Sequence, residues 1–406
     1  MQLIAPAQTQ RFSLQQLQPL ALPVIFILFG LIMGSWTGRI PAIRADLQIP
    51  HFALSMVLLC GGIGAVISYP VSSWMMARLG GRKTVLIAGL ALLAALVGIG
   101  LAPSVSLLMA AVFMLGIPAG CLNVGMNAVA TTLEKASGKS TMARLHAGCC
   151  AGGLAGATLG GLMASMNIAP ARHFLLLAAP LAVLVWLACH LLKAVVVDDD
   201  SAISDTKTSD AKTSDASPDA RAGKKMFALP RGPLALLGTL VFLGAMSEGS
   251  IADWSGVFLK DHFGVADAVA PLAFAAFSVT MLLARLAGDR LKGRHGARRL
   301  VSWGAALAAA GLLFAVSVDS AYLALAGFGA AGLGLALVFP FVFSAAGRQG
   351  PVALAGVATM AYSGSLMGPP VIGALAHGFG MQAAIGFIGV LAALIAIVAA
   401  RAGMLK

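Results

Sequence analysis

Residues 244–259 read Gly-Ala-Met-Ser-Glu-Gly-Ser-Ile-Ala-Asp-Trp-Ser-Gly-Val-Phe-Leu and contain two carboxylates, Glu248 and Asp253. They lie in an apolar segment from about Leu234 to Phe258. At about 1.5 Å per residue, a helix of this length crosses a lipid bilayer. A carboxylate in hydrocarbon costs several kcal/mol, so it is kept mainly where it faces a cavity, a partner or a path for protons. We therefore expect this helix to line the working site of a membrane protein.

The composition extends this interpretation to the whole chain. Of 406 residues, 59% are hydrophobic and 10% are charged, and the mean hydropathy is +0.92. A soluble protein carries about a quarter charged residues. Apolar runs of about 20 residues recur along the sequence, which predicts a helical protein that crosses the membrane many times. The net charge of +12 resides in short loops between these runs, so membrane topology explains it better than nucleic-acid binding does.

Catalytic and cofactor chemistry has no recognisable pattern in this sequence. The glycine-rich runs lie inside apolar segments, where helix packing explains them better than phosphate binding. We therefore expect neither an enzyme nor a cofactor or metal. The five cysteines all fall in apolar segments without metal-ligand spacing, and we expect free thiols at Cys60, Cys121, Cys149, Cys150 and Cys189.

Twelve membrane spans are predicted. A linker at Asp198–Arg231, with the repeats SDTKTSDAKTSDASPDA, cannot form a core and is expected to be disordered. It separates an N-terminal segment (1–19) and a six-helix bundle (20–193) from a second six-helix bundle (233–406), with the linker region at 194–232. The predicted spans are 20–41, 52–77, 84–102, 105–132, 142–167, 173–193, 234–259, 267–288, 299–317, 320–344, 352–376 and 381–401.

The positions of the basic residues predict the orientation. Of the 27 Lys and Arg residues, 22 fall on the side of the N-terminus. Four fall on the opposite side, Arg39, Arg44, Arg172 and Lys260, and Arg285 lies within the eighth span. Basic loops stay in the cytoplasm, so both termini are expected to be cytoplasmic.

The two halves of the sequence resemble each other. Ser35-Trp36-Thr37-Gly38 near the end of the first span matches Asp253-Trp254-Ser255-Gly256 near the end of the seventh. Residues 151–164 of the fifth span align with residues 363–376 of the eleventh through shared small residues. Two parallel repeats of six helices imply two bundles with a site between them near the middle of the membrane.

Two loops carry a recognisable signature. The first is Ala77-Arg78-Leu79-Gly80-Gly81-Arg82-Lys83, and the second is Gly288-Asp289-Arg290 followed by Gly296-Ala297-Arg298-Arg299. They resemble the Gly-x-x-x-Asp-Arg-x-Gly-Arg-Arg loop of the major facilitator superfamily, at both places where that family repeats it. The resemblance implies an all-α membrane protein with twelve transmembrane helices in two pseudo-symmetric bundles, usually a monomer.

A narrower resemblance rests on Glu248-Gly-x-x-Ala-Asp-Trp-Ser and Trp36-x-x-Arg39-Ile-Pro. These segments are similar to a bacterial inner-membrane branch allied to fucose permeases. The resemblance places the protein in the bacterial inner membrane.

The first loop departs from the family pattern, because Ala77 stands where the aspartate is expected and Gly81 replaces a base. In the family this aspartate helps to lock the cytoplasmic side of the outward-open state. The second loop keeps Asp289. We therefore assign the cytoplasmic gate to the following set, in which Asp289 and Arg290 carry more of the lock: Arg78, Arg82, Arg285, Asp289 and Arg290.

The two acids of the seventh span have different predicted roles. Glu248 lies about 21 Å from the cytoplasmic start of its helix and Asp253 about 28 Å, and they point about 140° apart. Glu248 is therefore near the bilayer centre and is either the proton-coupling or substrate-binding acid, or a neutral acid that packs between helices. Asp253 either contacts Arg39 as an extracellular gate, or caps or anchors a loop.

Polar and aromatic residues of other spans are candidates for substrate binding. Asn123 and Asn127 share one helix face and can bind hydroxyls or amides, or bond between helices. Trp36 and Trp254 are equivalent in the two repeats and either stack on a substrate or anchor the interface. Tyr362 and Ser363 lie in an unwound-looking segment that can face the cavity.

Two bases near the cytoplasmic side need partners. We assign Asp289, one turn further along, as the ion-pair partner of Arg285, because Glu248 lies too deep in the membrane for a contact to be assumed. His146 either relays protons or has a structural role as a histidine at a helix start near Glu134.

These features predict a proton-linked secondary transporter of a small polar organic solute that works by alternating access. A sugar-like solute is favoured by the Asn and Trp side chains and by the permease resemblance. The expected partners are this solute, protons and the lipid bilayer, without nucleic acid. Two alternatives stay open: an exporter of amphipathic compounds, and a membrane sensor that has lost transport and binds a partner.

Overall fold

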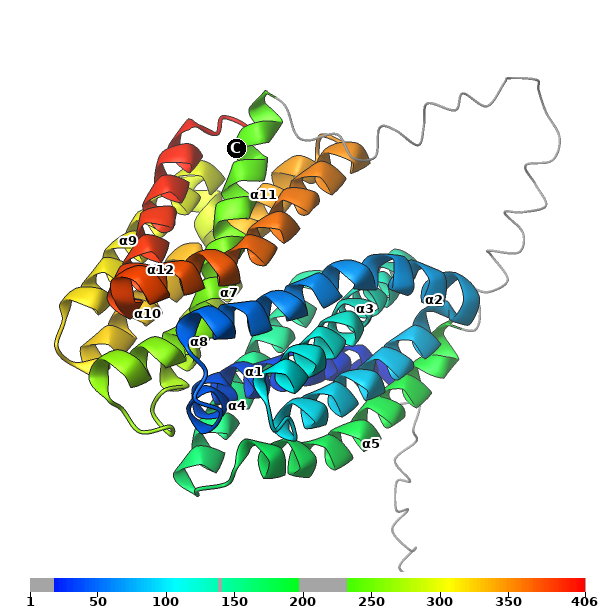
Figure 1. The fold of residues 1–406 in the computed structure, drawn as a ribbon. Coiled ribbons are helices and arrows are strands. Elements are labelled where there is room, and N and C mark those ends of the chain that lie inside the picture. The colour runs from blue at the N-terminus through cyan, green and yellow to red at the C-terminus, as the bar shows by residue number, and fades with distance from the viewer. Residues whose placement is uncertain (1–17, 138–140, 197–231, 406) are drawn as a thin grey trace, which may run out of the picture.

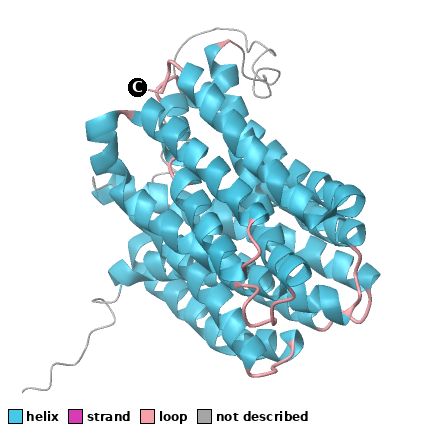
Figure 2. Ribbon diagram, turned by 90° about the vertical axis from the view of Figure 1, so that its left-hand side faces the viewer, coloured by secondary structure: helices cyan, strands magenta, loops and turns pink. Residues whose placement is uncertain are grey.

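The structure is a computed structural model that describes residues 18–137, 141–196 and 232–405. All regular secondary structure in these ranges is helical (Figure 2). The predicted N-terminal segment and the linker fall largely outside the described residues. In the first half of the chain the helices are α1 (Gln18–Asp46), α2 (His51–Gly100), α3 (Val105–Ser137), α4 (Met142–Ser165) and α5 (Pro170–Val196). In the second half they are α7 (Pro233–Phe263), α8 (Leu272–His295), α9 (Ala297–Ser317), α10 (Ala321–Leu335), α11 (Val338–Gly347) and α12 (Pro351–Arg401).

Two of these helices are too long for one crossing. α2 has 50 residues and α12 has 51, which at about 1.5 Å per residue is more than twice the hydrocarbon thickness of a bilayer. Each bends at one glycine, Gly80 (φ 74°) and Gly380 (φ 85°). A positive φ is readily adopted only by glycine, so these two residues divide each helix into two crossings.

The number of crossings agrees with the sequence. In the described ranges, nine helical stretches are long and apolar enough to span a membrane, and Leu272–Gly288 is a shorter apolar helix. α10 and α11 together form one of these stretches, interrupted at Ala336 and Leu337. When the halves of α2 and α12 are taken separately and α8 is included, twelve crossings result, as predicted.

The crossings form two bundles. α1 to α5 make the first bundle, at the lower right of Figure 1, and α7 to α12 make the second, at the upper left. Within the first bundle α1 packs on α4 and α2 on α3, and within the second α7 packs on α12 and α9 on α10. Between the bundles, α2 packs on α12, α4 on α8 and α1 on α7.

The sequence repeat corresponds to a repeated packing. A Cβ added at Gly152 of α4 would lie 2.0 Å from the carbonyl oxygen of Ile27 in α1. A Cβ added at Gly364 of α12 would lie 2.1 Å from the carbonyl oxygen of Phe242 in α7. These glycines are aligned in the two halves, and each brings two backbones into direct contact. The pairs α1–α4 and α7–α12 are therefore equivalent.

The ends of the bundles differ in charge. We call one end the basic end; it holds the turns at Gly80, Gly296 and residues 348–350. We call the other the far end; it holds the loops 47–50, 101–104, 166–169, 264–271 and 318–320. The exposed arginines of the basic end are Arg78, Arg144, Arg290, Arg294, Arg298, Arg299, Arg348 and Arg401.

Candidate functional site

An ion pair joins the predicted acid to a half-buried arginine of the same bundle. Oε2 of Glu248 in α7 lies 3.6 Å from Nη2 of Arg285 in α8, and the two side chains are 20% and 22% exposed. The other carboxylate oxygen, Oε1, is buried without a hydrogen-bond partner among the described residues. Glu248 thus lies between helices with half of its carboxylate unsatisfied.

The structure pairs Arg285 with Glu248, and the predicted pairing of Arg285 with Asp289 stays a prediction. Glu248 lies about 22 Å from the start of α7 and Arg285 about 15 Å from the end of α8, both measured from the basic end. The long arginine side chain spans this difference in depth, which helix positions alone do not reveal. Of the Asp289 side chain the structure gives no description.

Arg285 also connects the two bundles. Its Nε donates a hydrogen bond to the carbonyl oxygen of Ala336 at 3.2 Å. Ala336 lies in the interruption between α10 and α11, where a carbonyl has no helical partner. Nη1 of Arg285 donates to Sγ of Cys150 at 3.1 Å, and Cys150 belongs to α4 of the first bundle. The guanidinium is therefore held by both bundles.

The predicted asparagine pair is part of a second polar chain. Nδ2 of Asn127 donates to Oδ1 of Asn123 at 2.7 Å and to its carbonyl oxygen at 2.8 Å. Oδ1 of Asn127 lies 3.1 Å from Nε2 of His146 in α4, and the His146 ring packs edge-on against Phe26 with centroids 5.4 Å apart. The asparagines share one helix face, as expected, and they link α3 to α4.

A cavity lies where these polar groups meet the basic end. Its volume is about 650 Å³, within the usual range of about 300–1,000 Å³ for small-molecule sites. Its described lining contains the cations Arg144 and Arg285 together with His146, and it contains no carboxylate. The other lining residues are Met142, Ala147, Leu286, Gly288, Leu337, Phe339, Pro340, Phe341 and Phe343.

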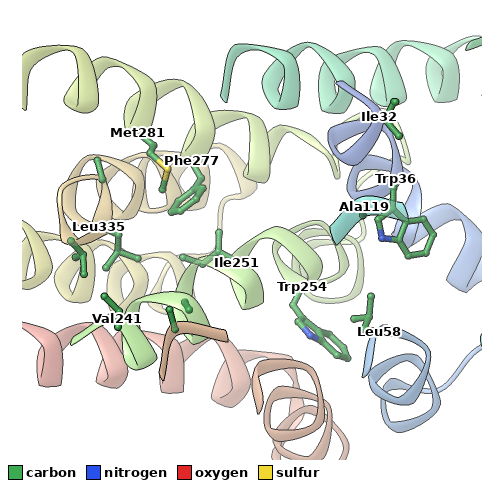
Figure 3. Packing of buried hydrophobic residues seen from close by; sticks show 14 of the residues in the cluster. Ile32, Trp36, Leu58, Ala119, Val241, Ile251, Trp254, Phe277, Met281 and Leu335 are labelled. Carbon is green, nitrogen blue, oxygen red and sulfur yellow. The ribbon is translucent and has the colours of Figure 1, made fainter. Parts of the chain in front are cut away.

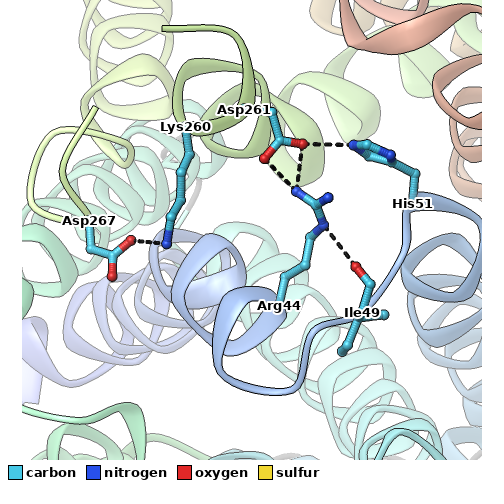
Figure 4. Close-up of polar contacts among 6 residues, drawn as sticks. All are labelled: Arg44, Ile49, His51, Lys260, Asp261 and Asp267. Carbon is cyan, nitrogen blue, oxygen red and sulfur yellow. Dashed lines mark hydrogen bonds and ion pairs between the residues drawn. The ribbon is translucent and has the colours of Figure 1, made fainter. Parts of the chain in front are cut away.

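Ionic contacts close the two bundles together at the far end (Figure 4). Nη1 of Arg44 in α1 lies 2.6 Å from both carboxylate oxygens of Asp261 in α7. Nε2 of His51 in α2 lies 2.7 Å from Oδ2 of the same aspartate. Nε of Arg44 donates to the carbonyl oxygen of Ile49 at 3.0 Å. We call Arg44, His51 and Asp261 the far-end cluster.

The far-end cluster replaces the predicted contact between Arg39 and Asp253. Arg39 is 2% exposed and donates to the carbonyl oxygens of Gly160 and Ile168, both in its own bundle. Asp253 has no hydrogen bond or ion pair to any described residue. The sequence contained a signal that was missed: Arg44 and Asp261 lie just beyond the predicted ends of the first and seventh spans.

The two predicted tryptophans are buried in this conformation. Trp36 is 4% exposed and Trp254 is fully buried. Figure 3 shows Trp254 beside Leu58 of the opposite bundle, and Trp36 beside Ala119 of its own bundle. The Trp254 ring also lies over His51, with centroids 6.4 Å apart. Both indoles are thus part of the packing near the far end, and neither lines the cavity.

Tyr362 and Ser363 lie in a regular helix, so the expected unwinding is absent. α12 departs from helical geometry at Gly380 only. Oγ of Ser363 donates to the carbonyl oxygen of Thr359 at 3.0 Å. The Tyr362 side chain is 47% exposed and contacts Tyr69 of α2 with ring centroids 4.9 Å apart. This tyrosine pair is a contact between the bundles.

The remaining gate residues lie at the basic end. Arg78 and Arg290 are exposed and Arg82 is half-buried, and its Nε has no partner among the described residues. None of the three has an ion pair to a described carboxylate. The described residues thus carry an ionic contact between the bundles at the far end and none at this loop signature.

Comparison with known proteins decides the family. Residues 21–258 and 237–404 each match the model of the Major Facilitator Superfamily. The chain belongs to this superfamily. The first match extends through the first bundle into α7, the second covers most of the second bundle, and membership makes this protein a membrane transporter of a solute.

Curated relatives of this major facilitator protein cover nearly its whole length. An uncharacterized MFS-type transporter of Yersinia pestis is 31% identical over 378 residues, which are 92% of this chain and 93% of the relative. The membrane protein MosC of Rhizobium meliloti is 31% identical over 370 residues, which are 89% of this chain and 84% of the relative.

Solved structures share the fold. The nucleoside transporter NupG superimposes with a TM-score of 0.69 at 14% identity and covers 94% of this chain and 98% of its own. A bacterial homolog of the human lysosomal transporter Spinster, in an inward-facing and unoccupied conformation, superimposes with a TM-score of 0.71 at 14% identity. The match covers 96% of this chain and 97% of the homolog. At this identity the likeness concerns the major facilitator fold alone.

Proposed function

We propose that this protein is a proton-coupled secondary transporter of a small polar organic solute that works by alternating access. The observation that carries the proposal is the Glu248–Arg285 pair beside a cavity at the basic end, while the far-end cluster joins the bundles on the other side. An ionisable pair inside the membrane marks a transport path by default. A site reached from one side only is what alternating access requires of each of its states.

The orientation follows from charge. The basic end carries most of the described arginines, at the ends of its helices and in its turns, and basic segments beside the membrane remain in the cytoplasm. On this proposal the cavity faces the cytoplasm of a bacterium, the protein lies in the inner membrane as a monomer, and both termini are cytoplasmic. The described conformation is then the inward-facing one.

Glu248 is the proposed proton carrier. While Arg285 holds its carboxylate, the two charges compensate each other between helices. Protonation of Glu248 removes its charge and weakens its attraction for the guanidinium, which frees Arg285 for a new partner. Because Arg285 also contacts Cys150 of the other bundle, a change at Glu248 reaches the interface that opens and closes.

The solute is proposed to be polar because the chain Asn123–Asn127–His146 adjoins the cavity. Amides and imidazoles suit hydroxyl groups, which together with the likeness to fucose permeases favours a sugar-like compound. The tryptophans lend less support, since both are buried in this conformation. Export of an amphipathic compound is the closest alternative, and the phenylalanines of the cavity favour it. For a transport-dead sensor, the altered first loop is the supporting observation.

The decisive experiment is transport in proteoliposomes under an imposed pH gradient. Wild-type protein is expected to accumulate its solute with the gradient, and Glu248→Gln is expected to equilibrate solute without accumulating it. Asp319→Asn serves as the control, because Asp319 is an exposed acid at the far end. Accumulation by Glu248→Gln equal to that of the wild type, at every pH tested, would remove the coupling role.

A further inference from the structure

We propose that the solute is a small organic anion and that Arg285 binds its carboxylate. This inference rests on the proposed transport function and adds the chemical class of the solute. Its basis is which member of the Glu248–Arg285 pair faces the cavity.

Of the two members of the pair, the cation lines the cavity and the acid does not. A solute that enters from the basic end therefore meets the guanidinium first. A site for a cationic solute would present the carboxylate instead.

The surroundings of Arg285 add positive charge. Arg144 lines the same cavity and has no hydrogen-bond or ion-pair partner among the described residues. Nζ of Lys292 lies 5.3 Å from the ring centroid of Phe341, another lining residue. Since no described carboxylate lines the cavity, the field within it favours an anion.

Arg285 keeps the donors that a carboxylate needs. A guanidinium has five N–H groups, and hydrogen bonds to Ala336 and Cys150 occupy two of them. Its distance to Glu248 is 3.6 Å, longer than a hydrogen bond. Three N–H groups thus have no hydrogen bond to the described residues, and two suffice for the paired geometry that carboxylates prefer. The bond to Ala336 holds the guanidinium in place.

The other lining residues of the cavity indicate which chemical groups the solute carries besides its carboxylate. Phe339 and Phe343 stack with ring centroids 5.7 Å apart and, with Phe341, form an apolar wall. His146 supplies a polar group from the opposite bundle. The site therefore suits a carboxylate with both an apolar and a hydrogen-bonding part, and it lies between the two bundles that have to move.

The inference also fixes the charge balance of transport. A solute carboxylate at Arg285 competes with Glu248 for the same guanidinium. Glu248 then loses its counter-charge, and a bound proton removes the uncompensated buried charge. One monocarboxylate and one proton move together, so the transport step carries no net charge.

The test compares each acid with a neutral compound of the same shape. Thermal stabilisation of the full-length protein is measured with glucuronate and glucose, lactate and lactamide, and benzoate and benzamide. We expect stabilisation by the acid of at least one pair and none by its neutral partner. Equal stabilisation by both members of every pair, or stabilisation by the neutral members only, overturns the anion assignment.

Matched variants then locate the binding. Arg285→Gln is expected to weaken binding of the acid about tenfold or more. Arg285→Lys keeps the charge but not the planar fork, so its affinity for the acid is expected to lie between those of the wild type and Arg285→Gln. Arg294→Gln removes the same charge from an exposed position on the same helix, outside the cavity, and should bind like the wild type. Acid binding by Arg285→Gln at wild-type affinity contradicts the proposal.

A second measurement leaves Arg285 intact. In a variant with Cys150 as its single cysteine, the acid is expected to slow alkylation of Cys150 by a maleimide, since Arg285 contacts this thiol. A variant with Cys60 alone is the control, because Cys60 lies on α2 away from Arg285. Unchanged alkylation of Cys150 at saturating acid contradicts binding at Arg285.

The two proposals fail in different ways. If neutral solutes are accumulated with the pH gradient and acids are not, the anion assignment is wrong and proton-coupled transport stands. If acids bind at Arg285 but their uptake ignores the pH gradient, the anion site stands and the coupling by Glu248 is wrong. Uptake of a monocarboxylate that responds to an imposed voltage contradicts the one-to-one charge balance.

Discussion

Arg44 of α1 and Asp261 of α7 form a two-pronged contact of 2.6 Å between the two bundles, and His51 of α2 joins it at 2.7 Å (Figure 4). The side chains of Arg44 and Asp261 are 18% and 25% exposed. The contact therefore lies at the boundary of water and protein, where it stabilises closure without locking it permanently.

Asp261→Asn is expected to open the far end more often. An ion pair of this exposure contributes about 0.2–1 kcal/mol, which corresponds to a shift of up to about fivefold in the population of the closed state. The measurement is the maleimide reactivity of a cysteine placed at Leu58, which the closed far end shields with Trp254 (Figure 3).

The exchanged pair Arg44→Asp with Asp261→Arg tests whether the contact itself matters. We expect this double variant to recover part of the closure lost in each single variant. No recovery would show that the single variants act through His51 or through local packing.

Gly364→Val is expected to destabilise the second bundle. Its first side-chain atom would lie 2.1 Å from the carbonyl oxygen of Phe242, so α7 and α12 have to separate, at a cost of about 1–3 kcal/mol or more. The thermal unfolding midpoint in detergent measures this effect. Gly98→Ala is the control, because nothing lies within 4 Å of the added atom, and an unchanged midpoint for Gly364→Val would contradict the close packing.

Gly380→Ala is expected to destabilise through the backbone alone. Only glycine adopts φ 85° and ψ 166° without strain, and another residue at this position destabilises the fold by about 1–3 kcal/mol. An added Cβ meets nothing within 4 Å at Gly380 or at Gly378, so space does not distinguish them. A lower unfolding midpoint for Gly380→Ala, with little change for Gly378→Ala, is the expected result.

Asn127→Ala is expected to weaken solute binding. It removes the partner of both Asn123 and the exposed His146, and leaving the partly buried amide of Asn123 unpaired costs about 1–3 kcal/mol. Thr131→Ala is the control, since its hydroxyl bonds only within its own helix. Ligand affinity is the measurement, and equal affinities for the two variants would show that the asparagine chain serves packing alone.

Much of this architecture was predictable because it depends on local properties. Hydropathy predicted the number of crossings, since every backbone polar group in lipid has to be satisfied within a helix. The aligned glycines 152 and 364 predicted equivalent helix pairs, and the structure confirms that each lies against a neighbouring backbone. Glu248 was identified as a buried acid from its position in an apolar run.

The partners of the charged residues were decided by the tertiary structure. Arg285 pairs with Glu248, which its depth in the helix had not suggested, and Arg44 pairs with Asp261 in place of the expected contact between Arg39 and Asp253. Hydropathy along a helix measures depth in the membrane within a few residues, but a contact between helices also depends on the rotation of each helix about its axis and on side-chain reach. These quantities arise only when the bundles pack, so the sequence by itself determined the number, length and repetition of the helices, while packing determined which charges meet.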